Sequence, residues 1–182
     1  MSAALIVPTL RSARLVMVPL SPIHSNGMFE MWRREEVCRY SGPAADYDGR
    51  PITLPAQTPA DSDKIIDFFV RSATDGSRFR WALLSAVDER FAGIAGFNSL
   101  GPRSEYAYHL HPSFWGQGLM TEASQLAMTW LRGRPECTQV EAYIEPANLA
   151  STKLAARLGL RPTGEVSDGA EQYLASISEL RV

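Results

Sequence analysis

The chain has 182 residues, of which 45% are apolar, enough for one globular domain with a substantial core. Its formal net charge is −2, so we do not expect the broad basic surface that binds nucleic acid. The sequence has no apolar run that approaches the length of a membrane span. We therefore expect a single domain over residues 1–182, with neither a nucleic-acid nor a membrane partner.

A short N-terminal run and the cysteines bear on location and redox state. The apolar run at residues 3–7 is too short for the core of a signal peptide and is closed by Pro8. Cys38 and Cys137 match no metal-binding spacing, although a single disulfide between them is open. We expect a cytoplasmic protein with free thiols and no metal site.

The N-terminal third predicts a strand and two helices. Residues 15–18 alternate and are β-rich, so they predict a strand. Ser21 and Pro22 are a helix start signal, followed by the apolar positions Ile23, Met28, Met31 and Trp32. Thr58 and Pro59 start a second helix, whose apolar face is Ile65, Ile66, Phe69 and Val70. Between the helices, residues 41–56 have no clear period, and such loops often carry function.

The middle of the chain predicts three strands. The β-rich runs at residues 80–87 and 91–98 flank a polar turn and predict an antiparallel hairpin. A further strand runs over residues 105–111. Its period of two places Glu105, Ala107, His109 and His111 on one face, and Tyr106, Tyr108 and Leu110 on the other.

The C-terminal third alternates helices and strands, which makes the whole chain a mixed α/β domain. A helical pattern begins near Thr121 and continues to Leu131. Residues 140–144 predict a strand, and Asn148 caps a helix that Gly159 ends. Two short strands are expected at residues 162–166 and 171–177.

Two glycines stand where a strand becomes a helix. Gly116 and Gly118 lie between the strand that ends near His111 and the helix that begins near Thr121. The first amides of a helix have no internal partner and the helix dipole favours negative charge, so such a junction can hold a phosphate without a lysine. The alternative is a strand-to-helix turn whose glycines serve packing.

Four segments, in order, carry a family resemblance. They are Arg14-Leu-Val-Met-Val-Pro-Leu20, Glu105-Tyr-Ala-Tyr-His-Leu-His-Pro112, Phe114-Trp-Gly-Gln-Gly-Leu-Met-Thr-Glu-Ala123, and Asn148-Leu-Ala-Ser151 with Leu158-Gly-Leu160. Together they resemble the GNAT superfamily of N-acetyltransferases, and in particular the branch that acetylates ribosomal-protein N-termini. The resemblance implies a central, mostly antiparallel sheet with a splayed strand pair and flanking helices. It also implies acetyl-CoA as acyl donor and an amine as acceptor, and leaves a homodimer open.

The resemblance assigns the donor site mainly to backbone amides. The expected acetyl-CoA contacts are Leu110, His111, Trp115, Gly116, Gln117, Gly118, Leu119, Met120, Thr121 and Asn148. Amides near Leu110 and His111 would hold the pantetheine arm and the carbonyl oxygen, and those of residues 117–121 the pyrophosphate. Met120 departs from the family, which carries a small residue there, so the larger side chain puts the tightness of the loop in doubt.

The resemblance makes Glu105 the expected base, because many relatives carry a base glutamate at the start of the splayed strand. The alternative for Glu105 is a solvated carboxylate in an ion pair; Glu141 and Glu145 are weaker candidates. Relatives protonate the thiolate with a tyrosine where this chain has Ala155, so Ser151 is the nearest replacement, unless it only serves the helix start. Acceptor choice is expected between Trp32 and Ala60, with Trp32, Tyr47 and His109 beside the substrate.

Two other functions compete with acetyl transfer. A dinucleotide-binding enzyme would use the same glycines, but the third glycine of that motif is Thr121 here and no βαβ unit precedes it. A non-catalytic acyl-CoA sensor on the same fold is the stronger alternative, and the presence of Glu105, Asn148 and Ser151 argues against it.

Overall fold

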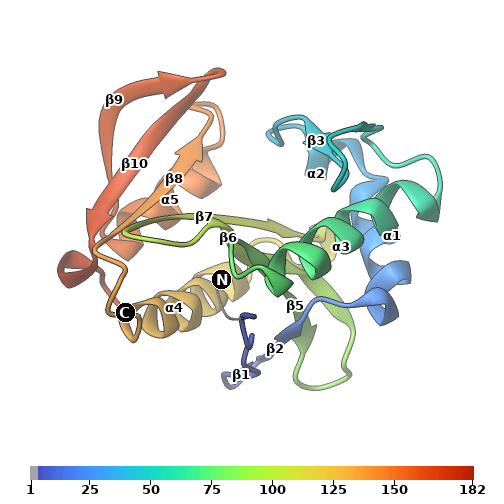
Figure 1. The fold of residues 1–182 in the computed structure, drawn as a ribbon, viewed down its shortest axis with the longest axis horizontal. Coiled ribbons are helices and arrows are strands. Elements are labelled where there is room, and N and C mark those ends of the chain that lie inside the picture. Colours follow the sequence, from blue (N-terminus) through green and yellow to red (C-terminus); the bar gives the residue numbers. More distant parts are fainter. Residues whose placement is uncertain (1–3) are drawn as a thin grey trace.

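The computed structural model describes residues 4–182, which form an eight-stranded sheet, a small two-stranded sheet and five α-helices (Figure 1). The large sheet contains β1 (Leu10–Arg11), β2 (Leu15–Pro19), β5 (Phe79–Ser85), β6 (Phe91–Ser99), β7 (Arg103–Leu110), β8 (Gln139–Ile144), β9 (Arg161–Ser167) and β10 (Ala170–Ser176). The small sheet pairs β3 (Ala44–Ala45) with β4 (Pro51–Ile52). The helices are α1 (Ser25–Trp32), α2 (Glu35–Cys38), α3 (Pro59–Thr74), α4 (Leu119–Arg132) and α5 (Leu149–Leu158).

The strand order of the large sheet is β1-β2-β5-β6-β7-β8-β10-β9. Within residues 4–182 its neighbours are antiparallel, with the exception of β7 and β8, which run parallel. This confirms the predicted mixed α/β fold with a mostly antiparallel sheet. Residue 3, the first of the N-terminal apolar run, lies outside the described residues. Over residues 4–182, each helix is too short or too polar to cross a bilayer.

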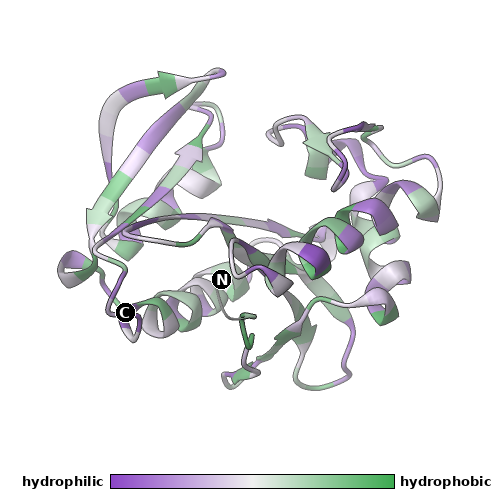
Figure 2. Cartoon of the chain, in the orientation of Figure 1, coloured by the Kyte–Doolittle hydropathy of each residue, from purple (hydrophilic) through white to green (hydrophobic). Residues whose placement is uncertain are grey.

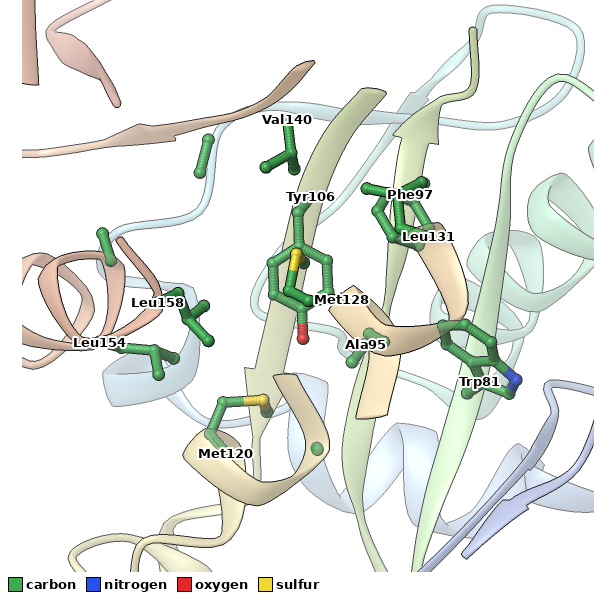
Figure 3. Packing of buried hydrophobic residues seen from close by; sticks show 14 of the residues in the cluster. Trp81, Ala95, Phe97, Tyr106, Met120, Met128, Leu131, Val140, Leu154 and Leu158 are labelled. Carbon is green, nitrogen blue, oxygen red and sulfur yellow. The ribbon is translucent and has the colours of Figure 1, made fainter. Parts of the chain in front are cut away.

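Two apolar clusters hold helices against the two faces of the sheet. Met28 and Met31 of α1 and Ile65 of α3 pack on one face, and Figure 2 shows hydrophilic and hydrophobic residues alternating around α3. On the other face, Met128 of α4 and Leu158 of α5 pack against Tyr106 and Phe97 (Figure 3). Burial of apolar surface on both faces fixes which face each side chain of a central strand must occupy.

The predicted helix starts are confirmed, but two assignments around them are wrong. Thr58 caps α3 and forms a capping box with Asp61. Val70, expected on the apolar face of α3, is 36% exposed. The buried face of α3 is formed by Ser62, Ile65, Ile66 and Phe69, and Val70 lies at its edge.

The other error lies at the start of the first helix. Residues Pro22–His24 form a 3-10 turn before α1, so Ile23 is 86% exposed and leaves the expected apolar stripe. His24 is buried at 7% exposure, and its Nδ1 accepts a hydrogen bond from the Ser21 amide. A capping role therefore explains this histidine.

Several short strands and one short helix were not predicted from the sequence. The stretch at residues 41–56 contains the small β3–β4 sheet, and its turn is held by Asp46 Oδ1, which accepts from the amides of Asp48 and Arg50. The sequence analysis also missed β1 and α2, which are two and four residues long. Cys38 and Cys137 are both free thiols.

Pairing between β7 and β8 is brief. Only Arg103, Ser104 and Glu105 of β7 find partners on β8, among the residues described. Beyond Glu105, β7 stays paired with β6 while β8 stays paired with β10, so the two strands part. This is the splayed strand pair that the resemblance implied.

Gly96 of β6 lies against the backbone of β5, and a substitution at this position tests how closely the two strands must pack. A Cβ added at Gly96 would lie 2.3 Å from the Phe79 carbonyl oxygen of β5. We expect Gly96→Ala to lower the free energy of unfolding by roughly 1–3 kcal/mol, because the backbone cannot yield cheaply. Chemical denaturation measures the change. Gly42→Ala is the matched control, since a Cβ there meets nothing within 4 Å; equal stability of both variants would contradict the prediction.

Candidate active site

The parting of β7 and β8 leaves backbone amides of β7 without strand partners. The His111 amide donates to the Ala92 carbonyl at 2.8 Å, toward β6. Because successive residues of a strand alternate in direction, the amides of Leu110 and Tyr108 point the other way, into the gap. The His111 amide is therefore not available for the expected contact with acetyl-CoA. The Leu110 amide points into the gap, as that contact requires.

The loop after β7 presents a row of amides. Gly116 and Gly118 have φ angles of +70° and +75°, the left-handed conformation that glycine adopts without strain. The first helical hydrogen bond of α4 runs from the Glu122 amide to the Gly118 carbonyl. No acceptor among residues 4–182 pairs with the amides of residues 116–121. Unpaired amides at a helix N-terminus form an anion site.

Contacts from the β1–β2 turn brace this loop. Arg14 donates from Nη1 to the Gln117 carbonyl at 2.8 Å and from Nε to Glu122 Oε2 at 2.8 Å. Ser12 donates to Glu122 Oε1 at 2.5 Å. Burial opposes ionisation of Glu122, but the hydrogen bonds from Ser12 and Arg14 outweigh it and lower the pKa of this carboxyl. The brace keeps an ionised carboxylate in the first turn of α4, where the helix dipole favours it.

The side chains of the loop mostly point away from the expected phosphate site. Trp115 donates from Nε1 to the Leu110 carbonyl at 2.8 Å, and Gln117 donates to the Ser113 carbonyl at 3.0 Å. Leu119 and Met120 are buried, and Figure 3 shows Met120 in the cluster that contains Tyr106. The large side chain at position 120 therefore belongs to the core and does not fill the loop, so this position and Thr121 would contact a phosphate through their amides.

Asn148 and Ser151 begin α5, on the same side of the sheet as α4. Asn148 Oδ1 accepts from the Ser151 amide at 3.3 Å, which confirms the predicted cap. Burial raises the pKa of the Tyr108 phenol to about 12, and the nearby Ser151 side chain opposes this rise. Tyr108 is a residue that the sequence analysis placed on the correct face but assigned no role. Alternation along β7 was the available signal.

Glu105 lies at the fork between β7 and β8, on the opposite face of the sheet. Its Oε1 accepts from Asn98 Nδ2 at 2.7 Å, and Asn98 Oδ1 accepts from Arg80 Nη2 at 2.5 Å. Neither Asn98 nor Arg80 was singled out from the sequence. An arginine inside the otherwise apolar strand β5 was the signal that could have found this contact.

Glu141, the weaker candidate for the base, is already engaged. It lies opposite Glu105 in the parallel register, and register partners share a face of the sheet. Its Oε2 accepts from Gln172 at 2.6 Å and lies 3.8 Å from Arg103. Glu105 is not in an ion pair with any described residue, so the expected alternative of a simple ion pair does not hold for it.

The structure brings two of the three expected acceptor residues together. Trp32 and His109 have ring centroids 4.4 Å apart, and Ser41 Oγ lies 2.8 Å from His109 Nε2. Trp32 Nε1 and His109 Nδ1 are buried without a hydrogen-bond partner among residues 4–182. Tyr47 lies elsewhere, under the Arg71 guanidinium and beside a cleft of about 310 Å³. Among residues 4–182, no ring contact joins Tyr47 to Trp32 or His109.

Neither His109 of β7 nor His111, the residue after β7, is a cation at neutral pH. Burial, with a smaller contribution from Arg80, lowers the pKa of His109 to about 3. Burial and the nearby Arg34 lower the pKa of His111, whose Nε2 accepts from Arg34 Nε at 3.1 Å. His109 is therefore suited to a neutral contact with a substrate and not to proton donation.

A family model described as an acetyltransferase (GNAT) domain matches residues 14–161, most of the chain. The chain belongs to the GNAT acetyltransferase family. The uncharacterized N-acetyltransferase p20 of Bacillus licheniformis is 24% identical over 163 residues, which are 88% of this chain and 86% of that protein.

Solved structures agree with the family. A Bordetella pertussis protein assigned to the GnaT acetyltransferase family is 26% identical with a TM-score of 0.72, over 92% of this chain and 98% of that one. The ribosomal L7/L12 N-terminal acetyltransferase RimL, solved in complex with coenzyme A, is 18% identical with a TM-score of 0.73, over 94% of this chain and 99% of that one. At that identity RimL shows that the fold is shared.

Gly118→Val tests the loop of this GNAT protein. A valine at a φ of +75° is strained, so the residue would shift and the amides of the first turn of α4 would lose their alignment. We expect coenzyme A affinity to fall by about tenfold or more, measured by isothermal titration calorimetry. Gly169→Val, with a φ of +82° in the distant β9–β10 turn, is the control for strain alone. Wild-type affinity in the Gly118 variant would argue against the loop.

The low pKa of His109 predicts a pH dependence of stability. Folding lowers this pKa from 6.5 to about 3, so between these values the unfolded chain binds a proton that the folded chain does not. Stability is therefore lost as pH falls through that window, by up to about 1.4 kcal/mol per pH unit. His109→Gln removes the group, and urea unfolding from pH 7 to pH 4 should show a shallower decline. Parallel declines in the variant and the wild type would contradict this assignment.

Proposed function

We propose that this GNAT protein transfers an acetyl group from acetyl-CoA to a primary amine, by direct attack of the amine on the thioester in a ternary complex. The acceptor is a protein N-terminus, an amino acid or a small-molecule amine. The observation that carries the proposal is the gap between β7 and β8, which has unpaired amides of β7 on one side and the amide row of residues 116–121 at its end.

The residues present fit acetyl-CoA. The orphaned amides of residues 116–121 suit the pyrophosphate, and the Leu110 and Tyr108 amides suit the pantetheine arm and the thioester oxygen. A backbone donor aimed at a developing oxyanion is usually the largest electrostatic contribution to acyl transfer. RimL, whose fold this chain shares, has been solved with coenzyme A, which supports the same donor here.

Glu105 is proposed as the base. An alkylammonium has a pKa near 10, so a proton must leave before the nitrogen can attack. Glu105 stands at the fork of the strands, and only one of its oxygens is occupied by a described residue. Starting from the ammonium, two protons leave the nitrogen. Glu105 takes the first and passes it to solvent before the attack, and it takes the second as the nitrogen gains the acetyl group and the carbon–sulfur bond breaks. The departing thiolate takes one proton.

Ser151, near Tyr108, is proposed to supply the proton that the thiolate takes. Both lie on the α4–α5 side of the gap, opposite Glu105, so the base and the acid flank the strands from the two faces. The raised pKa of Tyr108 keeps its phenol protonated at neutral pH, and Ser151 regains its proton from solvent.

Glu105→Gln separates catalysis from donor binding. The amide cannot accept a proton, so we expect kcat to fall about 10²-fold or more while acetyl-CoA affinity stays within a factor of two. Coenzyme A release, followed with a thiol reagent over a panel of amines, amino acids and N-terminally free peptides, measures turnover. Glu165→Gln, at an exposed position on β9, is the matched control.

Two results would overturn the proposal. Undiminished turnover in the Glu105 variant would remove this residue from the mechanism. Tight acetyl-CoA binding without coenzyme A release, for every acceptor in the panel, would favour the non-catalytic sensor.

A further inference from the structure

A hydrogen-bonded chain links Glu105 to a buried positive charge. Arg80 is 5% exposed, its Nη2 lies 2.5 Å from Asn98 Oδ1, and Asn98 Nδ2 lies 2.7 Å from Glu105 Oε1. We propose that Asn98 and Arg80 are positioning residues that hold the Glu105 carboxylate in one orientation for proton transfer from the acceptor amine. This inference rests on the proposed role of Glu105 as base.

The chemistry of the three groups permits one arrangement of the chain. A guanidinium only donates hydrogen bonds, an ionised carboxylate only accepts them, and an amide does both. Asn98 must therefore turn its oxygen to Arg80 and its NH₂ group to Glu105. Glu105 Oε2 accepts no hydrogen bond from residues 4–182, so one oxygen is fixed and the other is left for the amine.

The sheet places the three side chains on one face. Arg80 and Ala82 alternate with Phe79 and Trp81 along β5, and Ala82 packs in the α1–α3 cluster. On β6, Phe97 pairs with Tyr106 and Ser99 pairs with Glu105, so the register shifts at the residue between them. That irregularity sets Asn98 between β5 and Glu105, and bulges commonly re-aim side chains at functional sites.

Burying a guanidinium is costly, and the surroundings of Arg80 compensate only in part. Its Nη1 donates to the Phe79 carbonyl at 3.1 Å, and its Cζ lies 4.1 Å from the Phe69 ring centroid. Its Nε has no partner among the residues described. Burial lowers the pKa of Arg80 to about 9, against the opposing charge of Glu105, so the side chain remains a cation at neutral pH.

The charges around Glu105 set the direction of a pH effect. Arg80 faces it from β5 with Arg78 nearby, and Glu141 faces it from β8 with Arg103 alongside. Neutral His109 shares its face on β7. Asn98→Asp is nearly isosteric but removes the donor and adds a carboxylate beside Glu105, so Glu105 would keep its proton to higher pH.

The experiment measures kcat/KM against pH for Asn98→Asp. We expect the acidic limb to move up by about one pH unit, with kcat at neutral pH lowered about tenfold and acetyl-CoA affinity unchanged. Asn26→Asp, at an exposed position on α1, adds the same charge elsewhere and should keep the wild-type profile. Arg80→Lys, which still only donates, should lie closer to wild type than Arg80→Met, provided that circular dichroism shows both folded.

A double variant distinguishes failure of this inference from failure of the proposed function. If Asn98 acts through Glu105, Asn98→Asp has no further effect in a Glu105→Gln background. A wild-type pH profile for Asn98→Asp, or the same fractional loss in both backgrounds, overturns the positioning role while Glu105 stays the base. Wild-type turnover of Glu105→Gln alone overturns both.

Discussion

The structure depends on the parallel pairing of β7 and β8 ending after Glu105 and its partner Glu141. Each strand then follows a different neighbour, β6 for β7 and β10 for β8, so the sheet forks while it stays fully paired on its outer sides. Buried backbone amides that lack partners are costly, and a ligand that accepts hydrogen bonds removes that cost. The fork thus sets where the thioester would lie, and the amide row, Glu105 and Ser151 are each placed relative to it.

The two faces of the sheet carry different parts of the proposed reaction. The α4–α5 face carries the amide row, Asn148 and Ser151, while the α1–α3 face carries Glu105, His109 and Trp32. Residues 41–56 contact the second face through Ser41, whose Oγ lies 2.8 Å from His109 Nε2.

Local signals in the sequence predicted local structure well, and contacts across strands poorly. The caps at Thr58 and Asn148 and the alternation along β7 each depend on neighbours within a few residues, and the structure has them as expected. The pairing of the His111 amide with Ala92, and the contact between Arg80 and Asn98, depend on strand register, which no short window contains. The structure was therefore needed to show where β7 and β8 part, although the resemblance already gave Glu105 as the candidate base.

Met120 shows why a loop that binds through backbone tolerates an unusual side chain. The amides of residues 116–121 pair with no acceptor among residues 4–182, whereas the Met120 side chain is buried in the cluster that contains Tyr106. The conformation of the loop depends on Gly116 and Gly118, which adopt positive φ angles, and on the hydrogen bond from Arg14 to Glu122. The Met120 side chain therefore packs in the core and leaves the proposed phosphate contacts to the backbone amides.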